Sequence, residues 1–307
     1  MRRRQLGAKG PEISVIGYGA WEAGGADWGA NESEQVVVDA MRAALDAGID
    51  WIDTAEVYGD GTSERLVARA IEGRRDDVVV ATKVAPEPDG SGFRPGQVRA
   101  ACDGSLGRLR VDHIDLYQLH WPDERGIPVE DTWGAMTDLQ DAGKVLSIGV
   151  SNFDRALIER CEAIRHVDSL QPHFSMLHRT DADLIRWCGE QGIGVVSYAP
   201  LAYGLLTGAI NADTTFAPGD WRGESPDHGP FADLGGSLAT VERLRPVAER
   251  IGRSLVELAL AWNVYQPGVT AAIAGSRNPG HVRTNARAGD LDLDEATLAE
   301  LDGILEG

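Results

Sequence analysis

The sequence predicts an α/β fold, a (β/α)8 TIM barrel with an N-terminal β-hairpin and additional C-terminal helices. Short apolar runs with strand character alternate with amphipathic helical segments over the 307 residues. The alternation occurs eight times, and no shift in composition marks a linker between domains. Strands that alternate with helices form parallel sheets, and this number of units in a chain of this length favours a closed barrel. We therefore expect a single domain over residues 1–307, with an open, doubly wound sheet as the alternative.

The first elements follow from local signals. Residues 3–15 alternate weakly around the turn sequence Ala8-Lys9-Gly10-Pro11, which predicts the hairpin. The first helix, residues 32–46, repeats apolar residues at helical spacing and stops before Gly48, because glycine commonly ends a helix. The stretch Leu201 to Gly236 is long, irregular and interspersed with glycine and proline, so we expect a mobile cover over a binding site.

The same two patterns define the other elements. Strands are predicted at residues 15–17, 51–53, 78–83, 114–120, 145–151, 169–172, 194–198 and 269–274. Further helices are predicted at residues 63–71, 95–109, 129–142, 154–164, 181–191, 237–251, 255–265, 279–288 and 294–305.

Composition excludes several classes of function. The formal net charge of −19 argues against nucleic acid as a partner, because neutralising phosphates requires clustered lysine and arginine. No apolar stretch is long enough to span a membrane, and no apolar segment follows Arg2-Arg3-Arg4 to make a signal peptide. The cysteines Cys102, Cys161 and Cys188 lack metal-ligand spacing, which suits reduced thiols. We expect a cytoplasmic protein, a monomer or small homo-oligomer, that acts on a small molecule.

Titratable residues end three consecutive predicted strands. Asp53, Lys83 and His120 stand at the carboxyl ends of strands 51–53, 78–83 and 114–120. Each has an ordinary interpretation: a turn cap, an exposed loop lysine and a satisfied core histidine. In a barrel, however, the carboxyl ends of the strands converge on the face that carries catalytic residues. The coincidence therefore predicts an active site there.

Tyr58, in the loop after Asp53, gives this site a chemistry. A free phenol has a pKa of about 10, which burial would raise and a neighbouring Lys83 ammonium would lower, and we expect the ammonium to prevail and to make Tyr58 more acidic. Asp53 would keep Lys83 charged and oriented, and His120 would add a hydrogen bond to Tyr58 or to a substrate oxygen. Such a set suits a proton donor directed at a developing alkoxide, as in the reduction of a carbonyl group.

Carbonyl reduction needs a hydride, which no side chain supplies, so a cofactor is implied. The sequence Gly17-Tyr18-Gly19 is too short a match to a dinucleotide fingerprint to identify the site, because Glu22 occupies the position of the third glycine. Ser151, Asn152 and Gln171 place hydroxyl and amide groups at two neighbouring strand ends, suited to a carboxamide. Tyr198 offers a flat ring that suits stacking on a nicotinamide.

Phosphate groups would have two places to bind. The loop around Pro200, Leu201, Gly204 and Leu206 is rich in backbone donors that could approach a pyrophosphate. After the last strand, a helix opens at the sequence Gly275-Ser276-Arg277, and helix N-termini bind anions. Arg283 and Arg287 lie four residues apart on that helix, and this basic cluster in an acidic chain suggests the 2′-phosphate of NADP.

Together these motifs resemble the aldo-keto reductase family, in its bacterial and plant branch with inositol-catabolism-associated and auxin-induced members. The resemblance covers nearly the whole chain and rests on six motifs: Asp53-Thr54-Ala55-Glu56-Val57-Tyr58-Gly59, Ala81-Thr82-Lys83, Ile114-Asp115-Leu116-Tyr117-Gln118-Leu119-His120-Trp121, Gly149-Val150-Ser151-Asn152-Phe153, Leu170-Gln171-Pro172 and Ser197-Tyr198-Ala199-Pro200-Leu201. It implies a catalytic tetrad of Asp53, Tyr58, Lys83 and His120, and reduction of aldehydes or ketones with NADPH.

The resemblance also implies roles for the remaining positions. Ser151, Asn152 and Gln171 would hold the carboxamide, Tyr198 would stack on the nicotinamide, and residues 201–206 would cover the pyrophosphate. Ser276, Arg277 and Asn285 would bind the adenosine and 2′-phosphate end. His281 is a further candidate contact there, where family members often carry glutamine or arginine. NADPH or NADP+ is the expected cofactor, with NADH as the alternative.

The substrate pocket and the occurrence of turnover each leave an alternative. Trp21, Trp28 and Trp121, in loops after strands, and Trp221, in the irregular segment, are candidates for lining a partly apolar substrate pocket, although tryptophan also packs such loops together. Channel-associated β subunits resemble the same family, so a cofactor-binding regulatory or redox-sensing subunit without turnover is the alternative function.

Overall fold

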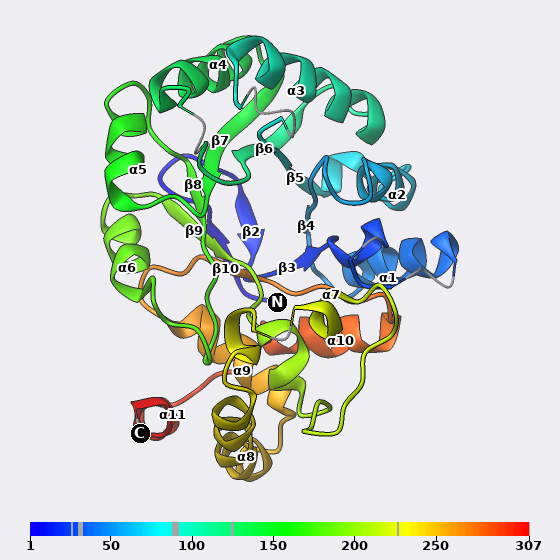
Figure 1. The fold of residues 1–307 in the computed structure, drawn as a ribbon, viewed down its shortest axis with the longest axis vertical. Coiled ribbons are helices and arrows are strands. Elements are labelled where there is room, and N and C mark those ends of the chain that lie inside the picture. Colours follow the sequence, from blue (N-terminus) through cyan, green and yellow to red (C-terminus); the bar gives the residue numbers. More distant parts are fainter. Residues whose placement is uncertain (26, 30–32, 88–91, 124–125, 226, 307) are drawn as a thin grey trace.

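The computed structural model describes residues 1–306 apart from 26, 30–32, 88–91, 124–125 and 226. Its centre is a closed barrel of eight parallel strands, in the spatial order β10-β3-β4-β5-β6-β7-β8-β9 (Figure 1). The barrel strands are β3 (Ile16–Gly19), β4 (Trp51–Asp53), β5 (Val79–Val84), β6 (Ile114–Leu119), β7 (Val145–Ser151), β8 (Ser169–Gln171), β9 (Gly194–Ser197) and β10 (Ala271–Ile273). β1 (Arg3–Gln5) and β2 (Glu12–Ser14) form the antiparallel N-terminal hairpin. The predicted (β/α)8 fold is confirmed.

Helices surround the barrel as an outer ring, and extra helices follow β9 and β10 (Figure 1). Their bounds are α1 (Glu34–Asp46), α2 (Thr62–Ala70), α3 (Pro95–Leu109), α4 (Val129–Asp141), α5 (Arg155–Glu162), α6 (Ala182–Glu190), α7 (Trp221–Glu224), α8 (Leu234–Arg250), α9 (Leu255–Tyr265), α10 (Pro279–Ala288) and α11 (Glu295–Glu306). Short 3-10 helices are η1 (Glu22–Gly24), η2 (Arg75–Asp77), η3 (Ala202–Thr207) and η4 (Gly229–Phe231). None of these described helices is long and apolar enough to cross a membrane.

The N-terminal hairpin packs against the amino-terminal end of the barrel. Leu6 and Ile13, from the hairpin, are 1% exposed and share a buried cluster with Trp51, Leu116 and Val196 from the barrel strands. These side chains fill the amino-terminal end of the barrel interior with apolar contacts, which exclude water. The open mouth of the barrel therefore lies at the opposite end, where polar side chains stand at the carboxyl-terminal ends of the strands.

Most element boundaries fall within three residues of the predicted ones. α1 has Ser33 as its N-cap, which accepts a hydrogen bond from the Val36 amide, and the predicted start at residue 32 lies outside the described residues. The stretch from Leu201 to Gly236 is less irregular than predicted, because it contains η3, α7, η4 and the first turn of α8. η3 packs against α8 and α9, and η4 packs against α8, and local sequence patterns do not reveal such contacts.

Candidate active site

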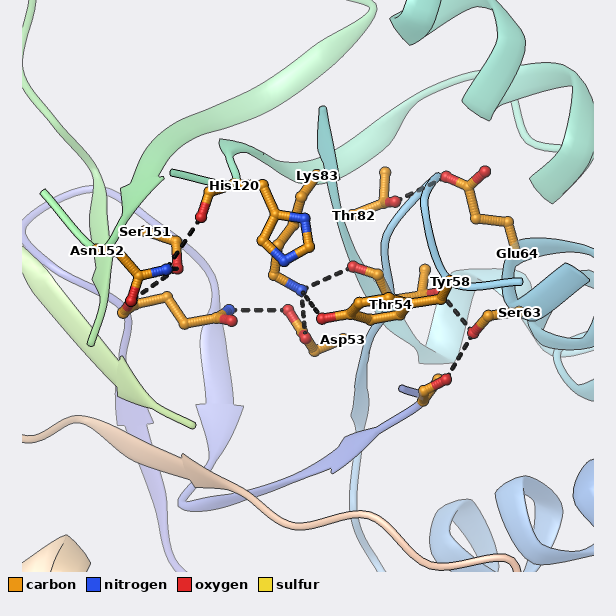
Figure 2. Close-up of polar contacts among 12 residues, drawn as sticks. Asp53, Thr54, Tyr58, Ser63, Glu64, Thr82, Lys83, His120, Ser151 and Asn152 are labelled. Atoms are coloured by element: carbon orange, nitrogen blue, oxygen red, sulfur yellow. Dashed lines mark hydrogen bonds and ion pairs between the residues drawn. The ribbon is translucent and has the colours of Figure 1, made fainter. Parts of the chain in front are cut away.

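Lys83 lies between Asp53 and Tyr58 in the barrel mouth (Figure 2). Its Nζ atom donates to Asp53 Oδ1 at 2.6 Å and to the Thr54 carbonyl at 2.8 Å, and lies 3.4 Å from the Tyr58 hydroxyl. The lysine side chain is fully buried, and that of Asp53 is 5% exposed. Because β4 and β5 pair in parallel with Asp53 opposite Ala81, Lys83 is carried one pleat further towards the mouth and points to the same side as Asp53. The strand register thus explains the ion pair.

The loop that carries Tyr58 is held by a close backbone contact. Gly59 has a φ of +61°, and a Cβ atom there would lie 2.2 Å from the Gly24 carbonyl oxygen. A Cβ atom on Gly24 would lie 2.7 Å from the Gly59 nitrogen. Only glycine fits at either position, so the two backbones pack directly against each other and fix the height of Tyr58 above Lys83.

Burial dominates the electrostatics of this group. It raises the pKa of Tyr58 well above its ordinary value, and the negative charges of Asp53 and Asp27 act in the same direction. Burial also lowers the pKa of Lys83, while the contact with Asp53 opposes that shift. We treat the Lys83–Asp53 pair as ionised because Asp53 accepts two hydrogen bonds from buried donors. Tyr58 is then a neutral phenol whose oxygen lies next to a cation.

His120 follows β6 and faces the same space (Figure 2). Its ring lies edge to face with that of Tyr58, with centroids 5.6 Å apart, and packs against Trp121 at 4.4 Å. Burial lowers the pKa of His120 well below its usual range, and the Lys83 charge lowers it further. Its buried Nδ1 atom has no hydrogen-bond partner within the described part of the chain. The imidazole is therefore neutral, with one N–H group that can be used in the mouth.

The four residues predicted to hold a nicotinamide lie together on neighbouring strands. Ser151 Oγ donates to the Gln171 carbonyl at 2.8 Å. Asn152 Nδ2 contacts Ser151 Oγ and the His120 carbonyl, both at 3.1 Å, and Tyr198 donates from its hydroxyl to Asn152 Oδ1 at 3.0 Å. Gln171 donates from Nε2 to Asp53 Oδ2 at 2.9 Å. The residues predicted to bind the carboxamide are thus connected directly to the Asp53–Lys83 ion pair through Gln171, a contact that the sequence did not reveal.

Backbone strain gathers around the same segment. Six non-glycine residues in the described chain have a positive φ, and four of them are Asn152, Ala199, Ala202 and Tyr203. Such conformations are unfavourable for residues with a Cβ atom and are concentrated at binding sites. Ala202 and Tyr203 belong to η3, which also contains Gly204, Leu205 and Leu206, and Pro200 and Leu201 precede it. The loop predicted to cover a pyrophosphate is therefore an unusual, tightly folded turn.

Arg277 already has partners from the protein itself. Its guanidinium donates to the carbonyls of Trp28 at 2.9 Å and Gly29 at 3.1 Å, and lies 3.9 Å from the Glu22 carboxylate. Burial raises the pKa of Glu22, and the Arg277 charge opposes that shift. Arg277 therefore ties the loop after β3 to the turn after β10.

The other candidate contacts of this turn are mixed. Asn278 caps α10, and its side chain accepts from the amides of Gly280 and His281, so two donors of the helix N-terminus are already bonded. Ser276 lies 3.4 Å from the exposed His281 ring, whereas Asn285 is buried. Gly275 packs against the Gly19 carbonyl, where a Cβ atom would lie 2.4 Å away. Arg287, in the last turn of α10, pairs with Glu257 at 3.1 Å.

Three of the four tryptophans predicted to line a substrate pocket form one aromatic cluster over the mouth. Trp21 stacks between Tyr58 and Trp221, with ring centroids 6.3 Å and 6.1 Å away, and meets Trp28 edge to face at 5.1 Å. Trp121 lies apart from them and is 39% exposed, beside His120. The first three rings give the site an apolar roof next to Tyr58.

Comparison with known proteins agrees with this geometry. The model of the aldo/keto reductase family matches residues 15–306. The chain belongs to this family. It is 35% identical over 316 residues to the aldo-keto reductase YhdN of Bacillus subtilis, a match that covers 100% of this chain and 94% of that protein. The resemblance stated from the motifs is confirmed, and this family member is an oxidoreductase.

Two solved structures are similar over almost the full length. A glycerol dehydrogenase from Gluconobacter oxydans has 32% identity and a TM-score of 0.86, covering 99% of this chain and 94% of the other. An aldo/keto reductase from Klebsiella pneumoniae, in complex with NADP and acetate, has 30% identity and a TM-score of 0.76, covering 98% and 96%.

Sequence reasoning missed a buried hydrogen-bond network next to Asp53 and Lys83 (Figure 2). Thr54 and Ser63 share a hydrogen bond of 2.8 Å between their hydroxyl groups, and Ser63 also donates to the Ala20 carbonyl at 2.7 Å. Glu64, fully buried, accepts from Thr82 at 2.7 Å and pairs with Arg108 at 2.5 Å. These bonds fasten α2 to the ends of β4 and β5. Thr54 and Thr82, each next to a predicted tetrad residue, were the available signal.

A second omission is His173, two residues after Gln171. Its ring stacks on Tyr198 with centroids 5.2 Å apart, and on His178 at 4.0 Å. Burial lowers the pKa of His173 to about 3, so the ring is neutral. A cavity of about 600 Å³ lies beside this stack and extends to Trp187. His173 supports the ring of Tyr198 from one side, and its position at a strand end was the only signal in the sequence.

Proposed function

We propose that this protein reduces an aldehyde or ketone to an alcohol with NADPH, and that Tyr58 donates the proton. The observation that carries the proposal is the buried Lys83 ammonium, 2.6 Å from Asp53 Oδ1 and 3.4 Å from the Tyr58 hydroxyl. A cation held by a carboxylate beside a phenol is an arrangement for stabilising a phenolate once its proton has left.

The polar groups of the mouth fit a nicotinamide. Asn152 and Gln171 present amide groups within one hydrogen-bonded set, Tyr198 lies in the same set, and the strained turn at residues 199–206 follows directly. The similar Klebsiella pneumoniae structure holds NADP. On these grounds we assign NADP(H) to this chain. Arg277 is the candidate for binding its 2′-phosphate. When bound, the reduced nicotinamide supplies the hydride.

The side chains of this chain then handle the proton. Tyr58 is neutral because burial raises its pKa, so its proton is present at neutral pH. The alkoxide that develops on the substrate is a stronger base than a phenolate, and the proton passes from the Tyr58 hydroxyl to that oxygen. Lys83 stabilises the phenolate that remains, and solvent returns the proton after the alcohol leaves. The neutral His120 ring donates a second hydrogen bond to the substrate oxygen and orients it.

Replacing Tyr58 by phenylalanine tests the proton donor. Positioned general acids contribute roughly 10²–10⁴-fold to rate, so we expect Tyr58→Phe to lower kcat by that factor for a panel of aldehydes. NADPH affinity, followed by quenching of tryptophan fluorescence, should change less than about threefold. A variant that keeps near-wild-type kcat would refute the role of Tyr58.

The same assay separates catalysis from the regulatory alternative. A reductase oxidises NADPH with at least some members of the aldehyde and ketone panel, and the oxidation is followed as a loss of NADPH absorbance. A cofactor-binding subunit would hold NADPH tightly and turn over none of them, and that outcome would favour the regulatory function.

A further inference from the structure

Asp53 uses its two oxygens on two different partners. Oδ1 accepts from Lys83 at 2.6 Å, and Oδ2 accepts from Gln171 Nε2 at 2.9 Å. Asp53 and Gln171 are 3% and 2% exposed, so both groups of this contact are shielded from bulk solvent. The bond joins residues 118 positions apart in the chain, across the barrel mouth from β4 to β8.

The contact fixes which way the Gln171 amide faces. A carboxylate can only accept hydrogen bonds, so the NH2 group of Gln171 must be the end that faces Asp53. The amide is planar, and its Oε1 atom therefore points away from Asp53. The main chain of Gln171 is held as well, because its carbonyl accepts from Ser151 Oγ at 2.8 Å and from the Asn152 amide at 3.2 Å.

The neighbouring amide has its donors engaged. The two hydrogens of Asn152 Nδ2 are directed at the Ser151 hydroxyl and the His120 carbonyl, both at 3.1 Å. Ser151 donates its own hydroxyl hydrogen to the Gln171 carbonyl. The side-chain donors of Ser151 and Asn152 are thus bonded within the protein, whereas Gln171 Oε1 is an acceptor fixed in direction by Asp53. The subsite is polarised towards ligands that donate.

We propose that Asp53 is a positioning residue in two directions: it orients Lys83 beneath Tyr58, and it orients Gln171 so that the cofactor's carboxamide is selected through its NH2 group. This inference rests on the proposed function, because it takes the nicotinamide to be the ligand of these residues. Asp53 thereby couples recognition of the cofactor to the ion pair that supports proton donation.

A cofactor analogue without the donor tests the inference. In the 3-acetylpyridine analogue of NADP+, a methyl ketone replaces the carboxamide, so the carbonyl is kept and the NH2 group is lost. We expect wild-type protein to bind NADP+ about tenfold more tightly than the analogue, the size of one net hydrogen bond. Dissociation constants come from quenching of tryptophan fluorescence, which does not depend on turnover.

Two variants locate the source of that preference. Gln171→Met removes the acceptor and should reduce the preference to about onefold. Asp53→Asn should do so as well, because its amide must offer its oxygen to Lys83 and its NH2 group to Gln171, which turns the Gln171 amide around. Gln118→Met is the matched control: it removes a buried glutamine amide from β6 and should leave the preference at about tenfold. Circular dichroism confirms that each variant is folded, and either test variant decides alone.

The outcomes distinguish this inference from the function it rests on. Equal wild-type affinity for both dinucleotides, or a preference that persists in Gln171→Met or in Asp53→Asn, would overturn the inference and leave the reductase intact. A wild-type protein that binds neither dinucleotide would overturn the proposed function, and this inference with it.

Discussion

The candidate site has two regions that are built differently. The strand-end cluster, Asp53, Lys83 and Gln171 with Tyr58 above them, is held by the register of adjacent strands and by buried hydrogen bonds. The rim consists of the loop after β3, the segment around α7 and Arg277, and is held by loop-to-loop contacts. The barrel strands fix the positions of the side chains in the first region. In the second region, contacts between loops fix the positions of the side chains.

The contacts of the rim show this dependence. Trp28 and Asp220 form an isolated antiparallel bridge, and the Trp221 amide donates to the Asp27 carbonyl at 2.9 Å. Arg222 pairs with Asp220 at 2.6 Å and lies over the Trp28 ring at 4.8 Å. Arg277 holds the same loop through the carbonyls of Trp28 and Gly29. The lesson is that the phosphate-reading role suggested for Arg277 competes with a structural role, whereas the roles in the strand-end cluster do not compete.

The largest effects should follow from breaking the strand-end ion pair. Lys83→Met leaves the Asp53 charge buried without its cation, so we expect about 3–5 kcal/mol of destabilisation and a loss of kcat of roughly 10³-fold. Urea denaturation and steady-state kinetics measure the two effects.

A double variant separates stability from catalysis in the same region. Asp53→Asn with Lys83→Met removes both charges, and replacing a whole buried pair is often neutral in stability. We expect most of the stability to return and none of the activity. Recovery of activity would show that the pair is needed only for folding.

The contrast between the regions also explains what the sequence could predict. Asp53, Lys83 and His120 were placed correctly because strand ends converge in any barrel, whatever the loops do. The lower pKa expected for Tyr58 is wrong: burial raises the pKa of the phenol, and the charges of Asp53 and Asp27 act in the same direction. The depth of burial depends on how the surrounding loops pack, which periodicity cannot supply.

The rim was beyond sequence reasoning for a different reason. A basic cluster was expected from the spacing of Arg277, Arg283 and Arg287, yet Arg277 turns to the carbonyls of Trp28 and Gly29. Those partners come from a loop 248 residues away in the chain. Spacing along one helix predicts neighbours on that helix, but it says nothing of acceptors that another loop brings.

Arg277→Ala sharpens the comparison at the rim. If the guanidinium reads the 2′-phosphate, the variant should weaken NADPH about 30- to 100-fold and NADH less than about tenfold, since hydrogen bonds to charged groups contribute roughly 1.5–3 kcal/mol. Arg243→Ala removes an exposed arginine from α8 and serves as the control. Equal losses for both cofactors would show that Arg277 acts only by holding the loop after β3.

The smallest effect concerns Glu56, between the predicted tetrad residues Asp53 and Tyr58. Burial raises the pKa of Glu56 from 4.5 to about 6, while a hydrogen bond from the Ala85 amide opposes the shift. Its carboxylate is 19% exposed and lies 3.8 Å from Arg108. Between these two pKa values the folded state binds more protons than the unfolded state, so the contribution of Glu56 to stability falls as pH rises through this window. At about 1.4 kcal/mol per pKa unit, and allowing for partial exposure, the loss is about 1–2 kcal/mol.

Glu56→Gln isolates this contribution, because all other titrating groups are shared with the wild type. The difference in free energy of unfolding, variant minus wild type, should increase by about 1–2 kcal/mol from about pH 4 to about pH 7, measured by urea denaturation at each pH. A difference that stays flat would mean that Glu56 titrates alike in both states. Burial beside the strand-end cluster would then carry no cost for an ionised carboxylate, contrary to the raised pKa of Glu56.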